Sequence, residues 1–276
     1  MPTTAEKVTT SEQAAKAVVS AAESGGGVRA SMAGLAWAGM SPFSLAAHCA
    51  HTTTDRSTFT LLAYEPSPTP ATIVAEGDPK PEAILSARKE LPLVKHAGYV
   101  EATLEQLLWA PSAEQVLSNV LVKQAVASLD KAIVAALDTT NTPVTATGSA
   151  SQRILAAHAE LLGLGSVPGA IAVSPADYAA IVGAETNSGY LNLERPEEGF
   201  PGRLFGLGLV PTPAVVEGTA FVFDPSGVVV AEQAESPMLF VSPMSVSNTL
   251  TVIVDLIAAT GIASSTAVAK VALTTA

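Results

Sequence analysis

The side chains best suited to bind a metal stand together in the segment AHCAH, which contains His48, Cys49 and His51. Two imidazoles and a thiolate are a typical beginning of a tetrahedral zinc site. However, Cys49 is the one cysteine of the chain, and the remaining histidines, His96 and His158, stand alone in the sequence. We therefore expect no metal and no cofactor, and a single cysteine also excludes an intrachain disulfide.

Patterns typical of enzymes are missing or incomplete. The segment GLGSVPG lacks the spacing of a dinucleotide-binding loop, and neither a P-loop nor a G-x-S-x-G nucleophile elbow occurs. Glu197 and Glu198 form a carboxylate pair, but they lie in a loop rich in Pro and Gly, where a solvated role outweighs acid–base catalysis. The sequence therefore predicts a protein that is not an enzyme.

The most concentrated group of charges is the segment VAEGDPKPE, residues 74–82. Its charged side chains are Glu76, Asp78, Lys80 and Glu82. Pro79 and Pro81 stiffen the segment, and short runs of β-branched and aromatic residues flank it on both sides. This pattern predicts two long strands joined by a stiff turn, and prolines confine such strands to the edge of a sheet. We expect a hairpin that projects from the body.

The composition limits the environment of the chain. Hydrophobic residues make up 48% of its 276 residues and charged ones 14%, against about 25% charged in an average soluble domain. The surface is therefore covered by a membrane or by other protein. No run approaches the roughly 20 apolar residues of a spanning helix, because Asp255 and Lys270 interrupt the most apolar window. We expect no membrane contact.

The charge pattern and the start of the chain bear on nucleic acid and on targeting. A net charge of -11 without a Lys/Arg cluster opposes a surface that binds phosphates. It leaves open a protein that merely encloses nucleic acid. The polar start MPTTAEKVTTSEQ has no secretory signal, so we expect synthesis in the cytoplasm.

The order of the expected elements indicates an α+β fold. An arm comes first and contains one helical fragment, at residues 12–22. The hairpin follows the arm. Apolar residues then recur at steps of three and four after Pro111, which predicts a helix of about 25 residues. A helix over 149–162, a buried strand GAIAVS and a helix that starts at Pro175 behind the cap Ser174 come next. Four strands lead to the end of the chain.

Together these segments resemble the major capsid proteins of tailed bacteriophages, which have the Hong Kong 97-type fold. Each motif is weak alone, but their order and spacing are specific over residues 57–272. The residues that carry the resemblance are Val74, Ala75, Glu76, Lys80, Pro81 and Glu82 of the hairpin; Val173, Ser174, Pro175 and Tyr178; Gly189, Tyr190 and Leu191; and Gly202, Leu204, Gly206, Leu209 and Val210.

The resemblance implies a virion shell subunit that self-assembles, as hexamers and pentamers, into an icosahedral capsid around phage double-stranded DNA. The implied division is an N-terminal arm (1–56), an extended loop (57–98), a peripheral domain (99–141 and 236–258) and an axial domain (142–235 and 259–276). Glu76, Asp78, Lys80 and Glu82 would then contact an adjacent subunit, a solvated turn being the alternative.

Some relatives lock their shells by condensing a hairpin lysine with an asparagine of a neighbouring subunit, assisted by a carboxylate. In this sequence Lys80 matches the hairpin lysine, while Asn248 and Asp255 fall in line with the other two positions. The departure is Asp255, because relatives usually carry the longer Glu. Hairpins with a Lys-Pro-Glu tip also occur in relatives that never crosslink. A non-covalent contact is therefore the alternative to the crosslink.

The resemblance also implies partners. Many relatives carry a scaffolding segment that a protease removes. A chain that starts at Met1 leaves no room for such a segment, so we expect a separate scaffolding protein, the alternative being that the N-terminal arm suffices. A portal and an optional decoration protein complete the implied partners, with assembly in the cytoplasm of a bacterial host. Two alternatives remain, an encapsulin-like bacterial nanocompartment of the same fold and a soluble hydrolase or binding protein with a buried α/β core.

Overall fold

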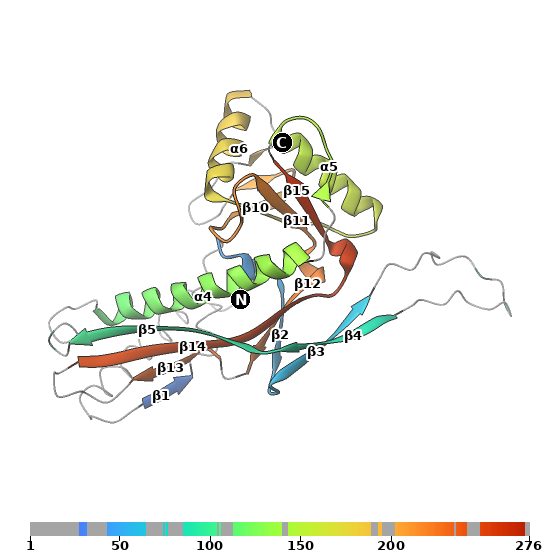
Figure 1. The fold of residues 1–276 in the computed structure, drawn as a ribbon. Helices are drawn as coiled ribbons and strands as arrows, with labels where there is room; N and C mark the ends of the chain where they lie inside the picture. The colour runs from blue at the N-terminus through green and yellow to red at the C-terminus, as the bar shows by residue number, and fades with distance from the viewer. Residues whose placement is uncertain are drawn as a thin grey trace.

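The computed structural model describes residues 28–31, 43–64, 74, 76, 85–103, 105, 113–139, 143–188, 193–194, 202–234, 236–241 and 249–273. In these residues a long helix lies across one sheet, a second sheet with two further helices stands above it, and a hairpin extends to one side (Figure 1). The expected α+β class is confirmed. The helical fragment predicted over 12–22 lies outside the described residues.

The long predicted helix is α4 (Ala113–Thr139), which has 27 residues. Of the apolar side chains that predicted it, Leu121, Leu129, Ile133 and Leu137 are fully buried, whereas Val120 is 40% exposed. These leucines and isoleucine belong to the first hydrophobic core. The helix is therefore held by its packing against the sheet below it rather than by propensity alone.

The first sheet has six strands. They are β1 (Val28–Ser31), β2 (Ala50–Thr54), β5 (Val94–Thr103), β12 (Val228–Gln233), β13 (Met238–Val241) and β14 (Thr249–Ile262). The strand order is β1-β13-β14-β12-β2, and β5 pairs with β14 along the latter's other side. Alternate residues of β14, such as Leu250, Val252 and Val254, belong to the same core as the buried stripe of α4. The remaining β14 residues face the opposite side of the sheet. We call this opposite side the outer face.

The second sheet has seven strands in the order β6-β15-β11-β7-β10-β9-β8. They are β6 (Pro143–Val144), β7 (Ala170–Val173), β8 (Leu193–Glu194), β9 (Arg203–Leu204), β10 (Leu207–Pro211), β11 (Thr219–Phe223) and β15 (Val268–Ala272). The central strand β7 is buried on both faces: Ala170 and Ala172 join the first core, whereas Ile171 and Val173 join a second core shared with the two shorter helices.

Those helices, α5 (Ala150–Gly163) and α6 (Pro175–Ser188), start as the sequence predicts. Ser149 caps α5 in a reciprocal capping box with Gln152. At α6 the Ser174 hydroxyl accepts from the Asp177 backbone N–H at 3.1 Å. Each cap satisfies a backbone donor that a helix leaves without an internal partner, so both helix starts are encoded locally.

Two short 3-10 helices join the sheets. Between β11 and β12 lies η2 (Pro225–Gly227), and between β14 and β15 lies η3 (Ser265–Ala267). The Asp224 backbone N–H donates to Ala267 O at 2.7 Å, and the Ala263 N–H donates to Gly227 O at 2.8 Å. These hydrogen bonds hold together the two connections between the sheets, β11 to β12 and β14 to β15. The relative placement of the sheets therefore depends on this junction.

Candidate assembly surfaces

The hairpin consists of β3 (Thr58–Tyr64) and β4 (Leu85–Pro92), which pair antiparallel. Its root is fixed to β14 by two contacts. A Cβ built on Gly261 would lie 2.3 Å from Leu91 Cδ1 and 2.9 Å from Leu61 Cδ2, so both leucines lie directly on the glycine. The Tyr64 backbone N–H also donates to Ala263 O at 2.7 Å. The anchor extends along β3, because Tyr64 is the last residue of that strand, and Figure 1 shows β3 and β4 at the edge of the body beside the end of β14.

One face of the hairpin carries exposed apolar side chains. Leu62 is 56% exposed and Tyr64 is 45% exposed. Register places Arg88 opposite Leu62 and Glu90 opposite Thr60, and cross-strand partners share a face. This hairpin face therefore combines apolar area with one positive and one negative charge. This face is therefore available for a contact with another protein.

The predicted tip residues can be placed only in part. Glu76 is exposed. Asp78, Lys80 and Glu82 lie outside the described residues, as does Asn248. Their assignment to a contact with a neighbouring subunit therefore stays a prediction.

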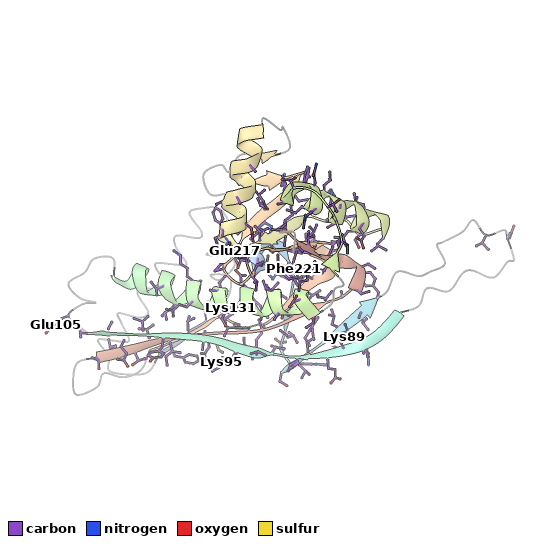
Figure 2. The ribbon with its side chains drawn as sticks, turned by 45° about the horizontal axis from the view of Figure 1, so that its top comes forward. Lys89, Lys95, Glu105, Lys131, Glu217 and Phe221 are labelled. Carbon is purple, nitrogen blue, oxygen red and sulfur yellow. The ribbon has the colours of Figure 1, made fainter. Side chains whose placement is uncertain are left out.

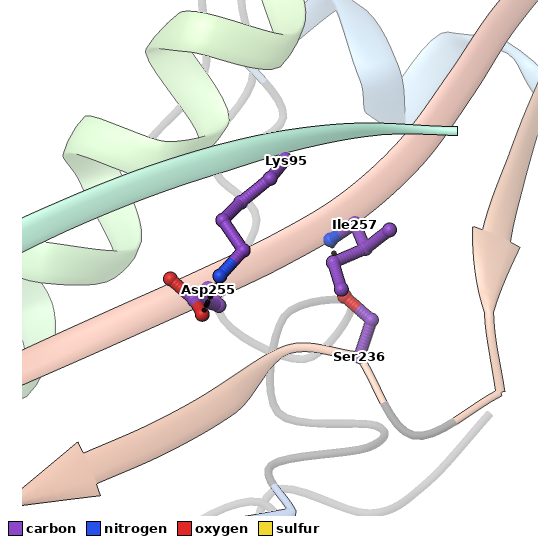
Figure 3. A network of polar contacts seen from close by, with 4 residues as sticks. All are labelled: Lys95, Ser236, Asp255 and Ile257. Carbon is purple, nitrogen blue, oxygen red and sulfur yellow. Dashed lines mark hydrogen bonds and ion pairs between the residues drawn. The ribbon is translucent and has the colours of Figure 1, made fainter. Parts of the chain in front are cut away.

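Asp255, the third crosslinking candidate, lies on β14 and is buried. Its Oδ2 accepts from Lys95 Nζ at 2.6 Å (Figure 3). Lys95 stands on the neighbouring strand β5 opposite Ile257, so the pair runs diagonally across two strands. The ion pair gives the buried carboxylate a charged partner within its own subunit. In the subunit alone, Asp255 thus holds β5 to β14.

The strand β14 changes partners beside this ion pair. Residues 258–262 of β14 pair with β12, and residues 252–255 of β14 pair with β13. In the gap between these strands the Ile257 backbone N–H donates to the Ser236 hydroxyl at 2.8 Å (Figure 3). Ser236 is buried and supplies the acceptor that a strand would otherwise provide. The sheet thus continues past the change of partner.

The histidine–cysteine trio is part of the packing. Cys49 is buried, and its Sγ lies 3.4 Å from Leu45 O, to which it donates. Burial, with the charge of Asp130 adding to it, raises the pKa of this thiol to about 12. His51 Nε2 is 2.7 Å from Ala46 O. In the described part of the chain no three His, Cys, Asp or Glu side chains come together as metal ligands would.

The sequence analysis did not single out the buried carboxylate of Asp130 on α4. Its Oδ1 accepts from the Ser44 hydroxyl at 3.0 Å and from the Ala46 N–H at 3.1 Å. These donors lie at the start of η1 (Leu45–His48), the 3-10 helix that precedes β2. Asp130 thereby ties the segment before β2 to the long helix. The signal in the sequence is an acid directly beside the apolar stripe residue Leu129.

Comparison with known proteins assigns the family. A family profile described as phage capsid protein matches residues 88–271, two thirds of the chain. The chain belongs to the phage capsid protein family. This capsid protein has no significant match among curated protein sequences. In the described residues, none of its helices combines the length and the hydropathy needed to cross a membrane.

Solved structures show the same fold as this capsid protein. The capsid of an empty GTA particle matches with a TM-score of 0.60 at 14% identity, covering 86% of this chain and 91% of that chain. The SrpI encapsulin complex from Synechococcus elongatus matches with a TM-score of 0.60 at 13% identity, covering 83% and 86%. A satellite phage P4 procapsid that includes the size determination protein Sid matches with a TM-score of 0.58 at 8% identity, covering 87% and 89%. The Hong Kong 97-type fold is thereby confirmed.

The root of the hairpin gives a first prediction. We expect Gly261→Ala to displace Leu61 and Leu91, because its methyl group would overlap both. Overpacking of this kind lowers the free energy of unfolding by about 1–3 kcal/mol. We expect it to change the direction of the hairpin and to lower the yield of shells. Limited proteolysis within β3 and β4 and electron microscopy of the assembly reaction measure both effects. Adding Leu91→Ala removes the closer of the two overlaps, so a double variant no better than the single one contradicts this account.

Proposed function

We propose that this shell-forming major capsid protein assembles as hexamers and pentamers into an icosahedral capsid around phage double-stranded DNA. The observation that carries the proposal is the hairpin, which is anchored at Gly261 and extends apolar and charged side chains beyond the subunit. A contact in which one surface reaches a different surface of the next copy is heterologous, and rotation closes such contacts into rings. Rings of six and five are the units that an icosahedral shell needs.

We keep the implied division into arm, extended loop, peripheral domain and axial domain as a proposal, but we move the boundaries at β5 and β12 to agree with strand pairing. We place β5 in the peripheral domain from Val94, because it pairs with β14 from that residue onward. We also place β12 there, since it pairs with β14 and β2 rather than with the second sheet. The axial domain is then the second sheet with α5 and α6.

The test is assembly of the purified chain. We expect negative-stain microscopy to reveal closed shells of uniform size, and nuclease-protected double-stranded DNA in shells recovered from infected bacterial cells. Particles no larger than small oligomers, with and without candidate assembly proteins, would contradict the proposal. We also propose that the protein is not an enzyme, because the family whose profile it matches consists of structural capsid proteins.

Covalent locking is a separate question with its own test. The candidates are Lys80, Asn248 and Asp255, and the ion pair of Asp255 with Lys95 favours a non-covalent contact. We expect shells boiled in denaturant to run as monomers on a gel. A ladder of multiples would instead assign the isopeptide chemistry, and Lys80→Arg would then remove the ladder.

We also propose partners beyond the chain itself. Because the satellite phage P4 procapsid includes a size determination protein, a capsid of this fold can assemble with a dedicated second protein. We therefore propose that a separate scaffolding protein, a portal and an optional decoration protein join this capsid, with assembly in the host cytoplasm. Uniform, correctly sized shells from the chain alone would contradict the need for the scaffold.

A nanocompartment remains the second candidate, because an encapsulin complex matches as well by TM-score as the GTA capsid does. The contents of the shell distinguish the two functions. Packaged DNA supports the capsid, whereas a single co-purifying enzyme in shells free of DNA supports the nanocompartment. The match to the phage capsid family favours the capsid.

A further inference from the structure

The exposed side of α4 carries two lysines on one face of the helix. Lys123, Ala127 and Lys131 follow one another at steps of four residues, which places them in one row along the helix. All three are exposed, as is Ala135 one step further along. We call these four residues the lysine face. Figure 2 shows Lys131 on the α4 side of the first sheet and Lys95 on the opposite side.

The positive charges of the lysine face are not neutralised within the subunit. In the described part of the chain, neither Lys123 nor Lys131 has a carboxylate within ion-pair distance. Asp138 lies in the last turn of the same helix, but its carboxylate is paired with Lys270 at 2.5 Å. The lysine face therefore presents two positive charges to whatever lies over it.

The outer face of the first sheet has the opposite character. Lys95 on β5 is neutralised there by Asp255 at 2.6 Å. Glu101 lies on the same side of β5 as Lys95, by the alternation of a strand, and it is exposed. The two sides of the sheet thus differ in sign, although the chain as a whole has a net charge of -11. A polyanion is therefore attracted to the α4 side and repelled by the outer face.

The spacing of the two lysines suits a nucleic acid duplex. Eight residues of α-helix separate Lys123 from Lys131 by about 12 Å along the helix axis. A DNA duplex carries about one phosphate charge per 1.7 Å of its axis, so a stretch of this length offers about seven. Each ammonium group can therefore reach a phosphate over a wide range of duplex orientations. The small side chains of Ala127 and Ala135 allow the phosphate backbone to come close to the helix.

Resting on the function proposed above, we infer that Lys123 and Lys131 of the lysine face contact the phosphates of the enclosed double-stranded DNA. Glu101 and the outer face then point away from the DNA. Contacts to phosphates carry no sequence information, as the enclosure of a long duplex requires. Two contacts are weak in one copy, but a shell repeats them in every subunit. The net charge of -11 still opposes DNA binding by the unassembled chain.

Acetylation of the lysines tests the contact directly. Empty shells and DNA-filled shells are treated with a small acetylating reagent, and peptide mass spectrometry measures the modification of each lysine. We expect Lys123 and Lys131 to react at least about fivefold more slowly in filled shells than in empty ones, because the duplex blocks their amines. Lys95, on the other side of the sheet, is the internal control and is expected to react equally fast in both.

The outcomes separate this inference from the proposed function. Shells that never hold DNA overturn the proposed function, and the inference with it. Filled shells in which Lys123 and Lys131 react as fast as in empty ones, or in which Lys95 slows instead, overturn the inference alone. Lysines that already react more slowly in empty shells than in unassembled subunits also overturn it, because protein then covers them.

Two matched double variants test whether charge is the cause. Electron cryo-microscopy of filled shells measures the distance between α4 and the outermost layer of DNA. We expect Lys123→Glu with Lys131→Glu to move this layer away from α4 by about 3 to 8 Å, up to the screening distance of physiological salt. Lys123→Arg with Lys131→Arg keeps both charges and is expected to leave the layer in place. Glutamate variants that form empty shells normally but no longer fill also support the contact, whereas an unchanged layer overturns it.

Discussion

Replacing Gly227 with alanine is expected to lower the free energy of unfolding by about 3 kcal/mol, because the new methyl group has no room. Its Cβ would lie 2.1 Å from Cβ of Ala267, against the 3.5–4.0 Å of an ordinary contact between carbon atoms. Ala267 is fully buried and has no flexible end that could turn aside. The backbone of η2 or η3 must therefore move.

That movement disturbs the junction between the sheets. Gly227 O accepts from the Ala263 N–H. The neighbouring hydrogen bond from Asp224 N–H to Ala267 O joins the same two connections between the sheets. For a domain of this size the loss corresponds to a fall of roughly 6–12 °C in Tm, measurable on unassembled subunits by circular dichroism. Gly183→Ala in α6 is the matched control, because a Cβ there meets nothing within 4 Å. Equal melting temperatures for the two variants would contradict the clash.

The junction variant also bears on assembly. An icosahedral shell closes only if each subunit presents its contact surfaces at the required angles. Gly227 lies where the first sheet, which carries the hairpin root, joins the second sheet. We therefore expect Gly227→Ala subunits that still fold at low temperature to form fewer and less regular shells than Gly183→Ala subunits.

Local signals in the sequence predicted several elements correctly. The caps Ser149 and Ser174 and the apolar stripe of α4 depend on residues a few positions apart, so periodicity and capping chemistry were sufficient. The strands β7, β11, β12, β13 and β14 were also visible as short β-branched runs between turns.

Contacts between distant segments could not be predicted. Lys95 and Asp255 are 160 residues apart, and their ion pair depends on the register of β5 against β14, which no local pattern encodes. Lys80 and Asn248 are crosslinking candidates by resemblance alone, and they remain predictions.

The second large effect is expected at Asp130, where Asp130→Leu removes the acceptor of two buried donors. Ser44 and Ala46 are both buried, and each donates to Asp130 Oδ1. A buried donor left without an acceptor costs about 1–3 kcal/mol, so we expect a loss of about 3 kcal/mol and release of η1 from α4. Asp130→Asn keeps one acceptor oxygen and is expected to lie within about 1 kcal/mol of wild type. A leucine variant as stable as the asparagine variant would contradict this role.

The pH dependence distinguishes the charge of Asp130 from its hydrogen bonds. Burial raises the pKa of this carboxyl above its ordinary value of 3.8, although the donors from Ala46, Leu45 and Ser44 and the charge of His48 act in the opposite direction. The folded state therefore holds this proton more firmly than the unfolded chain. The contribution of Asp130 to stability is then largest below pH 3.8 and declines as the pH rises through the raised pKa.

The variant Asp130→Asn carries an amide that does not titrate, so the difference in Tm between this variant and wild type isolates the effect from all other carboxylates. We expect this difference to shift in favour of the variant as the pH rises from about 4 towards 7. A difference that stays constant over this range means that the carboxyl titrates in the folded subunit as it does in the unfolded chain. Because η1 leads into β2 at the edge of the first sheet, the hydrogen bonds to Asp130 keep this segment docked on α4, and ionisation of the buried carboxyl makes the folded state less stable.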